Sequence, residues 1–273
     1  MWELSIAVDL KNLEVAKFIY QTLKSRSAEY ETVVTCYEQF DTIFVLLACP
    51  ENFQARVSVE VERCIIKAIC DFYKEKFLAE NLRLPLHENM SLMAFKKALI
   101  NFDKETDFYL ITKNLELKSN LHLDSFYHFK LKGLREKWSE LISLANENSD
   151  YLVSNEAFFD LLKFLIDNLE VCADEINVFE DENGYFIKPQ NREDEAEYQS
   201  LSKEGLVSSL IELSPKKINL FCCSDDNTTG FLAKIFEERV NICYNKSLEK
   251  IENFSFLKWW TIAVHLAVCC ENL

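Results

Sequence analysis

The chain has 273 residues, of which 49% are hydrophobic, and its 45 acidic and 30 basic side chains give a formal net charge of −15. This composition argues against a largely disordered chain, and the acidic balance argues against non-specific binding to nucleic acid or anionic membranes, which needs a basic surface. Only four glycines and four prolines occur, which argues against sandwiches, barrels and propellers, because those folds need turn residues at every hairpin.

Residues 1–82 are expected to form an N-terminal α/β segment. Leu4–Val8 is a short apolar run typical of a strand, and Leu10–Lys24 carries apolar residues at helical spacing. The apolar runs that follow predict two strands and then a long helix, over Glu31–Gln39, Thr42–Ala48 and Phe53–Leu82. The predicted order of elements is therefore β-α-β-β-α.

Residues 83–170 are expected to be helical. Capping residues and apolar spacing predict two short helices, one that ends at Leu99 and one that ends at Leu117. Ser154 or Asn155 would cap a later helix, whose apolar residues should face the core.

The strongest pattern in the chain spans residues 127–145. Apolar residues recur there in steps of three or four, as in an amphipathic helix: Tyr127, Leu131, Leu134, Trp138, Leu141 and Ala145. Four basic side chains of the same region are candidates for a phosphate site: Lys130, Lys132, Arg135 and Lys137. Acidic residues alternate with them, so we favour a solvated helix face.

Residues 171–250 are expected to form a second, smaller α/β segment. Asn183–Gly184 lies between two apolar runs and predicts a β-hairpin, because both residue types tolerate positive φ. A helix, a strand, a helix and a strand should follow, over Lys203–Leu213, Lys217–Cys223, Thr229–Arg239 and Val240–Tyr244. Residues 251–273 are expected to form a separate apolar tail helix.

The predicted fold is therefore helix-rich and mixed α+β. It combines an N-terminal β-α-β-β-α unit, a helical middle, and a small C-terminal α/β unit with a β-hairpin. The pattern leaves open whether the two α/β segments share one sheet.

Three stretches of the chain carry the same succession of apolar blocks as a known family: Leu123–Lys132 (LDSFYHFKLK), Glu156–Asn168 (EAFFDLLKFLIDN) and Gly205–Cys243, which includes GLVSSLIELSPKKINLF and IFEERVNIC. In these stretches the chain resembles the YtxC-like family of sporulation proteins from endospore-forming bacteria. The family blocks they are similar to include L-x-x-F-x-x-F-R-L-K and I-F-x-x-R-V-x-I-C.

The resemblance implies a link to sporulation and a cytoplasmic location, and it supplies no reaction. The chain departs from the family after Cys243, where Tyr244 and Asn245 follow in place of further cysteine. A metal or redox site built on cysteines at that place is therefore not expected. Residues 251–273 match nothing in the family.

The loop at residues 222–229 is the candidate site for chemistry, because ligands of open α/β sheets gather at the carboxyl ends of strands. Asp225 and Asp226 would supply the oxygen ligands that Mg²⁺ prefers. In the alternative that we favour, Asp226 or a neighbour caps the next helix and Asp225 is solvated. No glycine-rich phosphate loop occurs, and no cofactor is expected.

The ten cysteines lie mostly in apolar runs, without a CxxC motif or zinc-ligand spacing. We expect buried thiols in a reducing compartment. The adjacent Cys222 and Cys223 are expected to stay unbridged, because a disulfide between neighbours is strained. His122 and His128 are six residues apart, so one helix face does not hold both, and no HExxH motif occurs.

Two further segments bear on partners. Residues 147–200 carry −12 of the net charge. The acidic residues at 193–197 within this segment either recruit a basic partner or, in the alternative that we favour, form a hydrated loop. Residues 254–270 are too short, and too interrupted by Lys258 and His265, to span a membrane. We expect a packed terminal helix there, with an interfacial membrane helix as the alternative.

We therefore expect a non-catalytic cytoplasmic accessory protein of sporulation that acts through contacts with another protein. One alternative is a metal- or nucleotide-dependent enzyme that uses the loop 222–229. Another is a peripheral membrane protein that docks through residues 254–270. The identity of the protein partner and the oligomeric state do not follow from the sequence, and no nucleic acid partner is expected.

Overall fold

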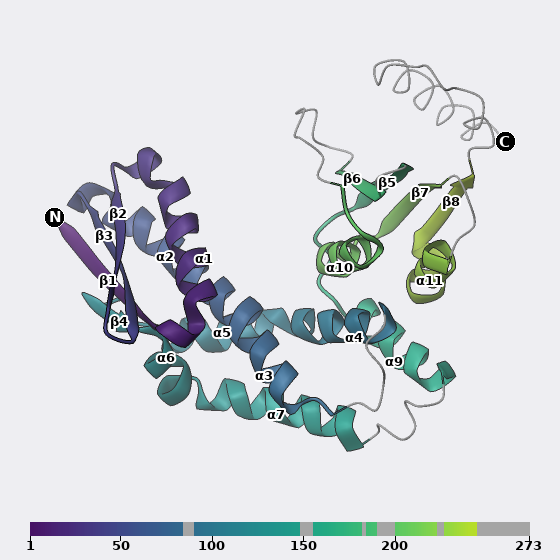
Figure 1. The fold of residues 1–273 in the computed structure, drawn as a ribbon, viewed down its shortest axis with the longest axis horizontal. Helices are drawn as coiled ribbons and strands as arrows, with labels where there is room; N and C mark the ends of the chain where they lie inside the picture. The colour runs from purple at the N-terminus through teal and green to yellow at the C-terminus, as the bar shows by residue number, and fades with distance from the viewer. Residues whose placement is uncertain (84–89, 148–154, 182–183, 190–199, 223–226, 245–273) are drawn as a thin grey trace, which may run out of the picture. The chain divides into compact units, whose positions relative to one another are not determined.

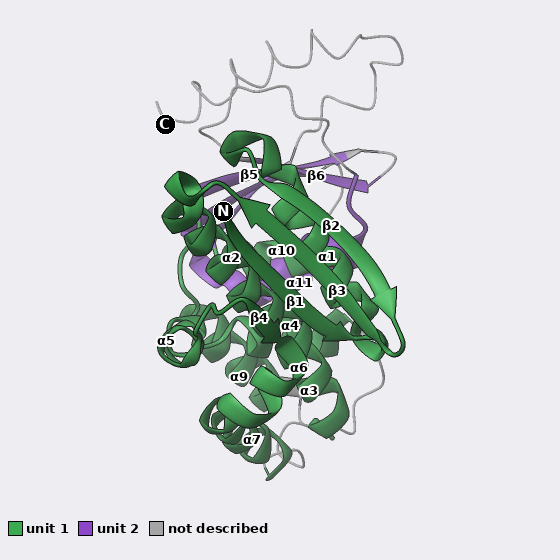
Figure 2. Ribbon diagram, turned by 90° about the vertical axis from the view of Figure 1, so that its left-hand side faces the viewer, with its two compact units in different colours: residues 1–172, 207–214 green, residues 173–206, 215–273 purple. Residues whose placement is uncertain are grey.

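The computed structural model describes residues 1–83, 90–147, 155–181, 184–189, 200–222 and 227–244 (Figure 1). It confirms the predicted fold class, a helix-rich α+β fold with two small mixed sheets. The chain divides into two compact units, coloured separately in Figure 2: unit 1 is Met1–Cys172 with Val207–Ser214, and unit 2 is Ala173–Leu206 with Pro215–Leu273.

The N-terminal sheet and its helices follow the predicted order, with β1 (Trp2–Asp9), α1 (Leu13–Ser25), β2 (Val33–Gln39), β3 (Thr42–Cys49) and α2 (Gln54–Ala68). β3 lies between β2 and β1 and is antiparallel to both. A fourth strand, β4 (Asn120–His122), pairs in parallel with β1 and completes the order β2-β3-β1-β4. The sequence does not predict β4, because three residues, two of them polar, show no strand periodicity.

One face of the N-terminal sheet packs on helices and the other is open. Ile43, Val45 and Leu47 of β3 are buried, and they belong to the same core cluster as Ile19 of α1 and Val61 of α2. The alternate side chains of β3 are only partly buried, and Figure 2 shows the strands in front of the helices. This alternation is typical of a sheet that is covered on one side.

The long helix predicted over Phe53–Leu82 is interrupted once. After α2, a π-helical turn spans Ile69–Tyr73, and α3 covers Lys74–Asn81. A π turn inserts an extra residue into a helix, so the side chains that follow it point in a new direction. Tyr73 and Lys74 lie at this point and are both buried.

The two short helices predicted in the middle of the chain are α4 (Met90–Asn101) and α5 (Lys104–Asn114). α5 ends before Leu117, because the backbone is already extended at Leu115 on its way to β4. The later predicted helix is α9 (Asn155–Asp167), which packs on α4.

The predicted amphipathic helix begins with α6 (Leu123–Ser125) and a second π turn (Phe126–Lys130), and it continues as α7 (Lys132–Glu147). Its apolar stripe is buried as predicted, with one exception. Leu141 is only partly buried, whereas the neighbouring Ile142 is buried. After Trp138 the buried stripe therefore continues through Ile142 and Ala145, in steps of four and three.

Unit 2 contains the predicted hairpin and the later strands and last helix: β5 (Glu175–Asp181), β6 (Gly184–Pro189), β7 (Lys217–Cys222), α11 (Asn227–Phe236) and β8 (Val240–Tyr244). The remaining predicted helix, α10 (Lys203–Leu213), begins in unit 2 and belongs to unit 1 from Val207 onward. The sheet of unit 2 has the order β6-β5-β7-β8, with β5 antiparallel to β6 and parallel to β7. The two α/β segments therefore form two separate sheets.

None of the helices that the structure describes is long and apolar enough to cross a membrane. The predicted tail helix (251–273) and the acidic loop at 193–197 lie outside the described residues.

Candidate functional site

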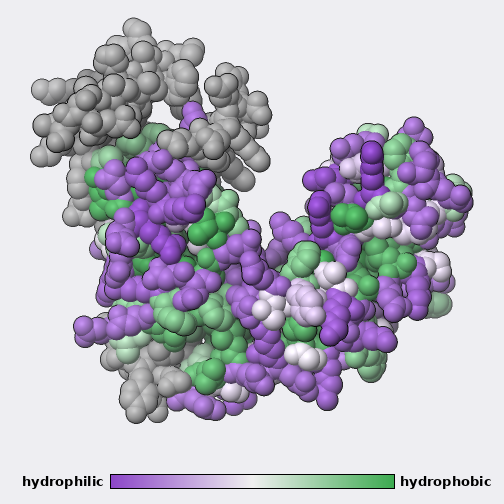
Figure 3. All heavy atoms as spheres, turned by 180° about the vertical axis from the view of Figure 1, so that it is seen from behind, coloured by the Kyte–Doolittle hydropathy of each residue, from purple (hydrophilic) through white to green (hydrophobic). Residues whose placement is uncertain are grey.

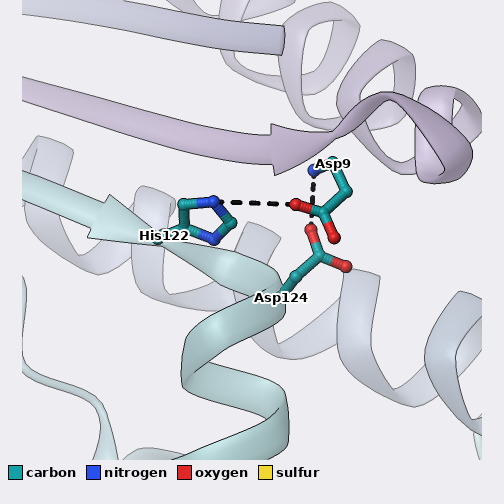
Figure 4. Close-up of side chains that lie close together, drawn as sticks. All are labelled: Asp9, His122 and Asp124. Atoms are coloured by element: carbon teal, nitrogen blue, oxygen red, sulfur yellow. Dashed lines mark hydrogen bonds and ion pairs between the residues drawn. The ribbon is translucent and has the colours of Figure 1, made fainter. Parts of the chain in front are cut away.

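Three side chains meet where β1 and β4 end (Figure 4). Asp9 is the last residue of β1, His122 is the last residue of β4, and Asp124 lies two residues after His122, in α6. The two strands are parallel neighbours, so their carboxyl ends lie side by side. One ligand atom from each of the three residues lies within 4.8 Å of the others. Sequence reasoning missed this cluster, because more than a hundred residues separate Asp9 from the other two.

Asp124 is the buried centre of this cluster. Its Oδ2 accepts a hydrogen bond of 2.7 Å from the backbone N–H of Asp9. Its Oδ1 accepts one of 2.6 Å from the side-chain amide of Asn12 and one of 3.0 Å from the hydroxyl of Tyr73. Three donors thus compensate the burial of the carboxylate, which would otherwise be costly. Burial and the nearby Asp124 raise the pKa of Tyr73, which keeps the phenol protonated as a donor.

Asp9 and His122 form the solvent-facing side of the cluster, with 30% and 42% of their side chains exposed. The carboxylate of Asp9 is 3.1 Å from the ammonium of Lys11, and its other oxygen is 3.6 Å from Nε2 of His122. The hydrogen bond to Asp9 raises the pKa of Lys11. Nδ1 of His122 accepts the N–H of Ser125 at 3.4 Å, so the neutral imidazole carries its proton on Nε2, toward Asp9.

Two carboxylates and an imidazole are a suitable ligand set for a divalent transition metal. In this geometry, however, protein groups already satisfy the three side chains. Lys11 is paired with Asp9, three donors bind Asp124, and His122 lies between Asp9 and the backbone N–H of Ser125. The cluster is therefore an ion-paired junction that ties the end of β1 to α6 and the π turn, and a cation would first have to displace Lys11.

A second buried cluster lies next to the first. It includes Lys74, which follows Tyr73 directly in the chain. The side chain of Asp107 is fully buried, and its Oδ2 is 2.7 Å from Nζ of Lys74. Its Oδ1 accepts hydrogen bonds of 2.9 Å from Lys137 and 3.1 Å from the indole of Trp138. Burial lowers the pKa of Lys74, and Asp107 opposes this shift. The pair is enclosed in the core of unit 1, so it supports the fold.

The predicted metal ligands Asp225 and Asp226 lie outside the described residues, so this site stays a prediction. The structure describes the loop's two ends, with β7 ending at Cys222 and α11 beginning at Asn227.

The four basic residues considered for phosphate binding do not form one site. Lys132 pairs with Glu136 on the surface at 3.3 Å, and Lys137 turns inward to Asp107. The guanidinium of Arg135 lies 5.5 Å from the centre of the Tyr127 ring. Lys130 is exposed in the π turn before α7, so the four charges lie in different environments.

The described cysteines agree in part with the expected buried thiols. Cys49, Cys64 and Cys70 are buried, and burial raises the pKa of the last two to about 12. Cys36 and Cys172 are exposed.

The open face of the N-terminal sheet carries apolar side chains beside the Asp9 cluster. One row crosses all four strands in register, from β2 to β4: Tyr37, Phe44, Ala7 and His122. The rings of Tyr37 and Phe44 stack with centroids 5.0 Å apart. We call the apolar side chains at least partly exposed on this face the open-face patch: Val33, Tyr37, Phe44, Leu46 and Ala48. Figure 3 shows one side of the molecule, on which hydrophobic patches lie between hydrophilic residues.

A comparison with protein families matches a model of the YtxC-like family to residues 86–241, which is more than half of the chain. No curated protein and no solved structure gives a significant match. The family match includes His122 and Asp124 of the cluster, whereas Asp9 and the open-face patch lie before it.

Proposed function

The chain belongs to the YtxC-like family, and from this membership we propose that it is a cytoplasmic accessory protein of sporulation that acts through contact with another protein. The resemblance of its three sequence blocks to sporulation proteins supports the biological setting. The lack of a recognised catalytic motif in the sequence supports a role in binding.

The open-face patch is the observation that carries this proposal. Val33 is 67% exposed and Tyr37 is 45% exposed, although both lie in a strand. Phe44 and Leu46 are partly exposed beside them. A contiguous apolar patch of this kind on a protein surface marks an interaction site, because water contact with it is unfavourable.

The charges around the patch indicate the chemistry of the partner. Glu3 lies on the same face at its margin, and the side chains that the four strands direct to this face include no lysine or arginine, although Asp9 at the other margin is already paired with Lys11. The whole chain is also strongly acidic. A partner with an apolar stripe flanked by basic residues, such as a basic amphipathic helix, would match both the patch and its margin.

The experiment compares partner binding by the wild-type chain and by Leu46→Lys. This substitution places a positive charge in the middle of the open face, where it would oppose both apolar contact and a basic partner. Val59→Lys is the matched control, because Val59 is a 44% exposed apolar residue on α2. Each tagged chain is captured from sporulating cells, and each recovered protein is then purified and titrated directly.

We expect one basic amphipathic partner to bind the wild type and Val59→Lys equally, and Leu46→Lys at least about tenfold more weakly. Leu46→Lys should also fail to restore spore yield in a strain that lacks the protein. Equal binding and equal spore yield for the two variants would contradict the proposal.

A further inference from the structure

β2 forms the free edge of the N-terminal sheet. All seven of its residues, Val33–Gln39, pair with β3, and the register runs without a bulge. Among the described strands none pairs with its other side. A strand in this position presents unpaired backbone N–H and C=O groups to solvent.

The hairpin turn defines which backbone groups are free. Gln39 and Thr42 are the last paired residues, so the loop has two residues, and the first of them, Phe40, has a φ of 54°. In a two-residue hairpin the residues that flank the turn exchange backbone hydrogen bonds, and bonded and non-bonded pairs then alternate. Val34, Cys36 and Glu38 therefore direct their N–H and C=O groups away from β3.

β2 lacks the features that usually protect an edge strand. It contains no proline, lysine or arginine, and Glu38 is its one charged residue. Large apolar side chains are exposed along it and at its turn. Val33 is 67% exposed, Tyr37 is 45% exposed and Phe40 is 88% exposed.

We propose that β2 pairs with β2 of a second copy of the chain, antiparallel, about a two-fold axis at Cys36. Cys36 is the central residue of the strand, and its N–H and C=O both face the free edge. In this register Cys36 lies opposite Cys36 of the second copy, and Val34 lies opposite Glu38. The two N-terminal sheets then form one continuous sheet of eight strands.

The sequence of β2 is complementary to itself in this register, which favours a second copy as the occupant. Glu38 faces the apolar Val34, so no like charges lie opposite each other. Val33 of each copy lies beside the turn of the other copy, next to the highly exposed Phe40. Tyr37 lies opposite Thr35 and diagonally across from Tyr37 of the second copy. The pairing thus partly covers Val33, Tyr37 and Phe40 of both copies along the junction of the two sheets.

This inference does not rest on the proposed accessory function. Edge-to-edge pairing leaves the centre of the open face uncovered, so dimer formation and partner binding can fail separately. Leu46→Lys tests partner binding alone, and the variants described next test the edge.

The test uses the full chain in sedimentation velocity at increasing protein concentration. Cys36→Pro removes the N–H at the free edge without removing a bond to β3, and Cys36→Ser is its matched control. We expect the wild type and Cys36→Ser to form the same dimer. In Cys36→Pro the dissociation constant should rise at least about tenfold, because the central pair exchanges two hydrogen bonds.

A second variant serves in case Cys36→Pro does not fold. Phe40 has a positive φ, which asparagine tolerates well, so Phe40→Asn should keep the hairpin and remove the contact with Val33. It should also weaken the dimer.

Salt gives a further test by sedimentation velocity. Both copies are acidic, so the dissociation constant of the dimer should fall when added salt screens the repulsion between them.

Cross-linking tests the register directly. A short bis-maleimide should link wild-type chains into a covalent dimer through Cys36, and should form no covalent dimer of Cys36→Ser although that variant still dimerises. A monomeric wild type at all concentrations would overturn the proposal. A dimer that Cys36→Pro and Phe40→Asn leave unchanged, or one that bis-maleimide does not link through Cys36, would place the interface elsewhere and would also overturn it.

Discussion

The hydroxyl of Tyr73 donates a hydrogen bond of 3.0 Å to the buried carboxylate of Asp124, 51 residues further along the chain. Tyr73 is the last residue of the first π turn, and Asp124 lies two residues before the start of the second π turn. The rings of Tyr73 and Tyr127 are also in contact, with centroids 4.6 Å apart. The two irregular turns thus face each other, and between them they position the cluster at the end of β1 and β4.

Tyr73→Phe should destabilise the protein without disturbing this ring contact. The substitution removes one of three donors to a carboxylate that cannot reach water. We expect the free energy of unfolding to fall by about 1–2 kcal/mol, as measured by urea denaturation. Tyr109→Phe is the control. Tyr109 is 61% exposed, so loss of its hydroxyl should not change the free energy of unfolding. Equal stability of the two variants would mean that the Tyr73 hydroxyl contributes nothing to the junction.

The local pattern of apolar and polar residues is enough to predict most helices and strands. It fails where the position of a residue depends on contacts with residues far away in the sequence. The spacing of Val57, Val61 and Leu78 predicts one long helix. The helical spacing of apolar residues continues across the π turn, so the π turn could not be predicted from the sequence. The sequence pattern predicts no strand at His122, whereas the structure ends the three-residue strand β4 there. Only the pairing of that strand with β1 brings His122 to Asp9, and no local pattern encodes this pairing.

The stability of the protein should fall as the pH rises above 9. Cys64 and Cys70 have a pKa of about 12 in the fold, against an ordinary value of 9.0. Between these values the unfolded chain loses thiol protons that the folded chain keeps, so unfolding becomes easier. At pH 10 each thiol should lower the free energy of unfolding by about 1.4 kcal/mol relative to its value well below pH 9.

Urea denaturation at pH 8 and pH 10 measures this effect. Cys64→Ala should show a smaller loss between the two pH values than the wild type, although its stability at pH 8 is lower. Cys36→Ala is the control, because Cys36 is exposed and its removal should leave the pH dependence unchanged. A loss of the same size in all three chains would assign the effect to other groups.

Removal of Lys11 should convert the Asp9 cluster into a better cation site. The ammonium of Lys11 lies 3.1 Å from Asp9 and competes with a metal for the same carboxylate. We expect Lys11→Met to bind Mn²⁺ at least about tenfold more tightly than the wild type in calorimetric titration. Adding His122→Ala to Lys11→Met should reverse this gain, whereas adding His128→Ala should not. Identical titrations of the wild type and Lys11→Met would show that the cluster does not hold the cation.

Gly184 should be the glycine of unit 2 that is most sensitive to substitution. It begins β6 with a φ of 137°, and a Cβ atom there would lie 2.5 Å from the backbone oxygen of Leu201. Leu201 and Tyr185 exchange two backbone hydrogen bonds at this point, so the oxygen cannot move away without breaking them. We expect Gly184→Ala to lower the free energy of unfolding by about 2 kcal/mol or more, from the strained φ and the clash together.

Gly230→Ala, in α11, is the matched control, because the space around it is open and alanine favours a helix. It should leave stability unchanged or raise it, and a loss like that of Gly184→Ala would show that general sensitivity of unit 2 causes the effect.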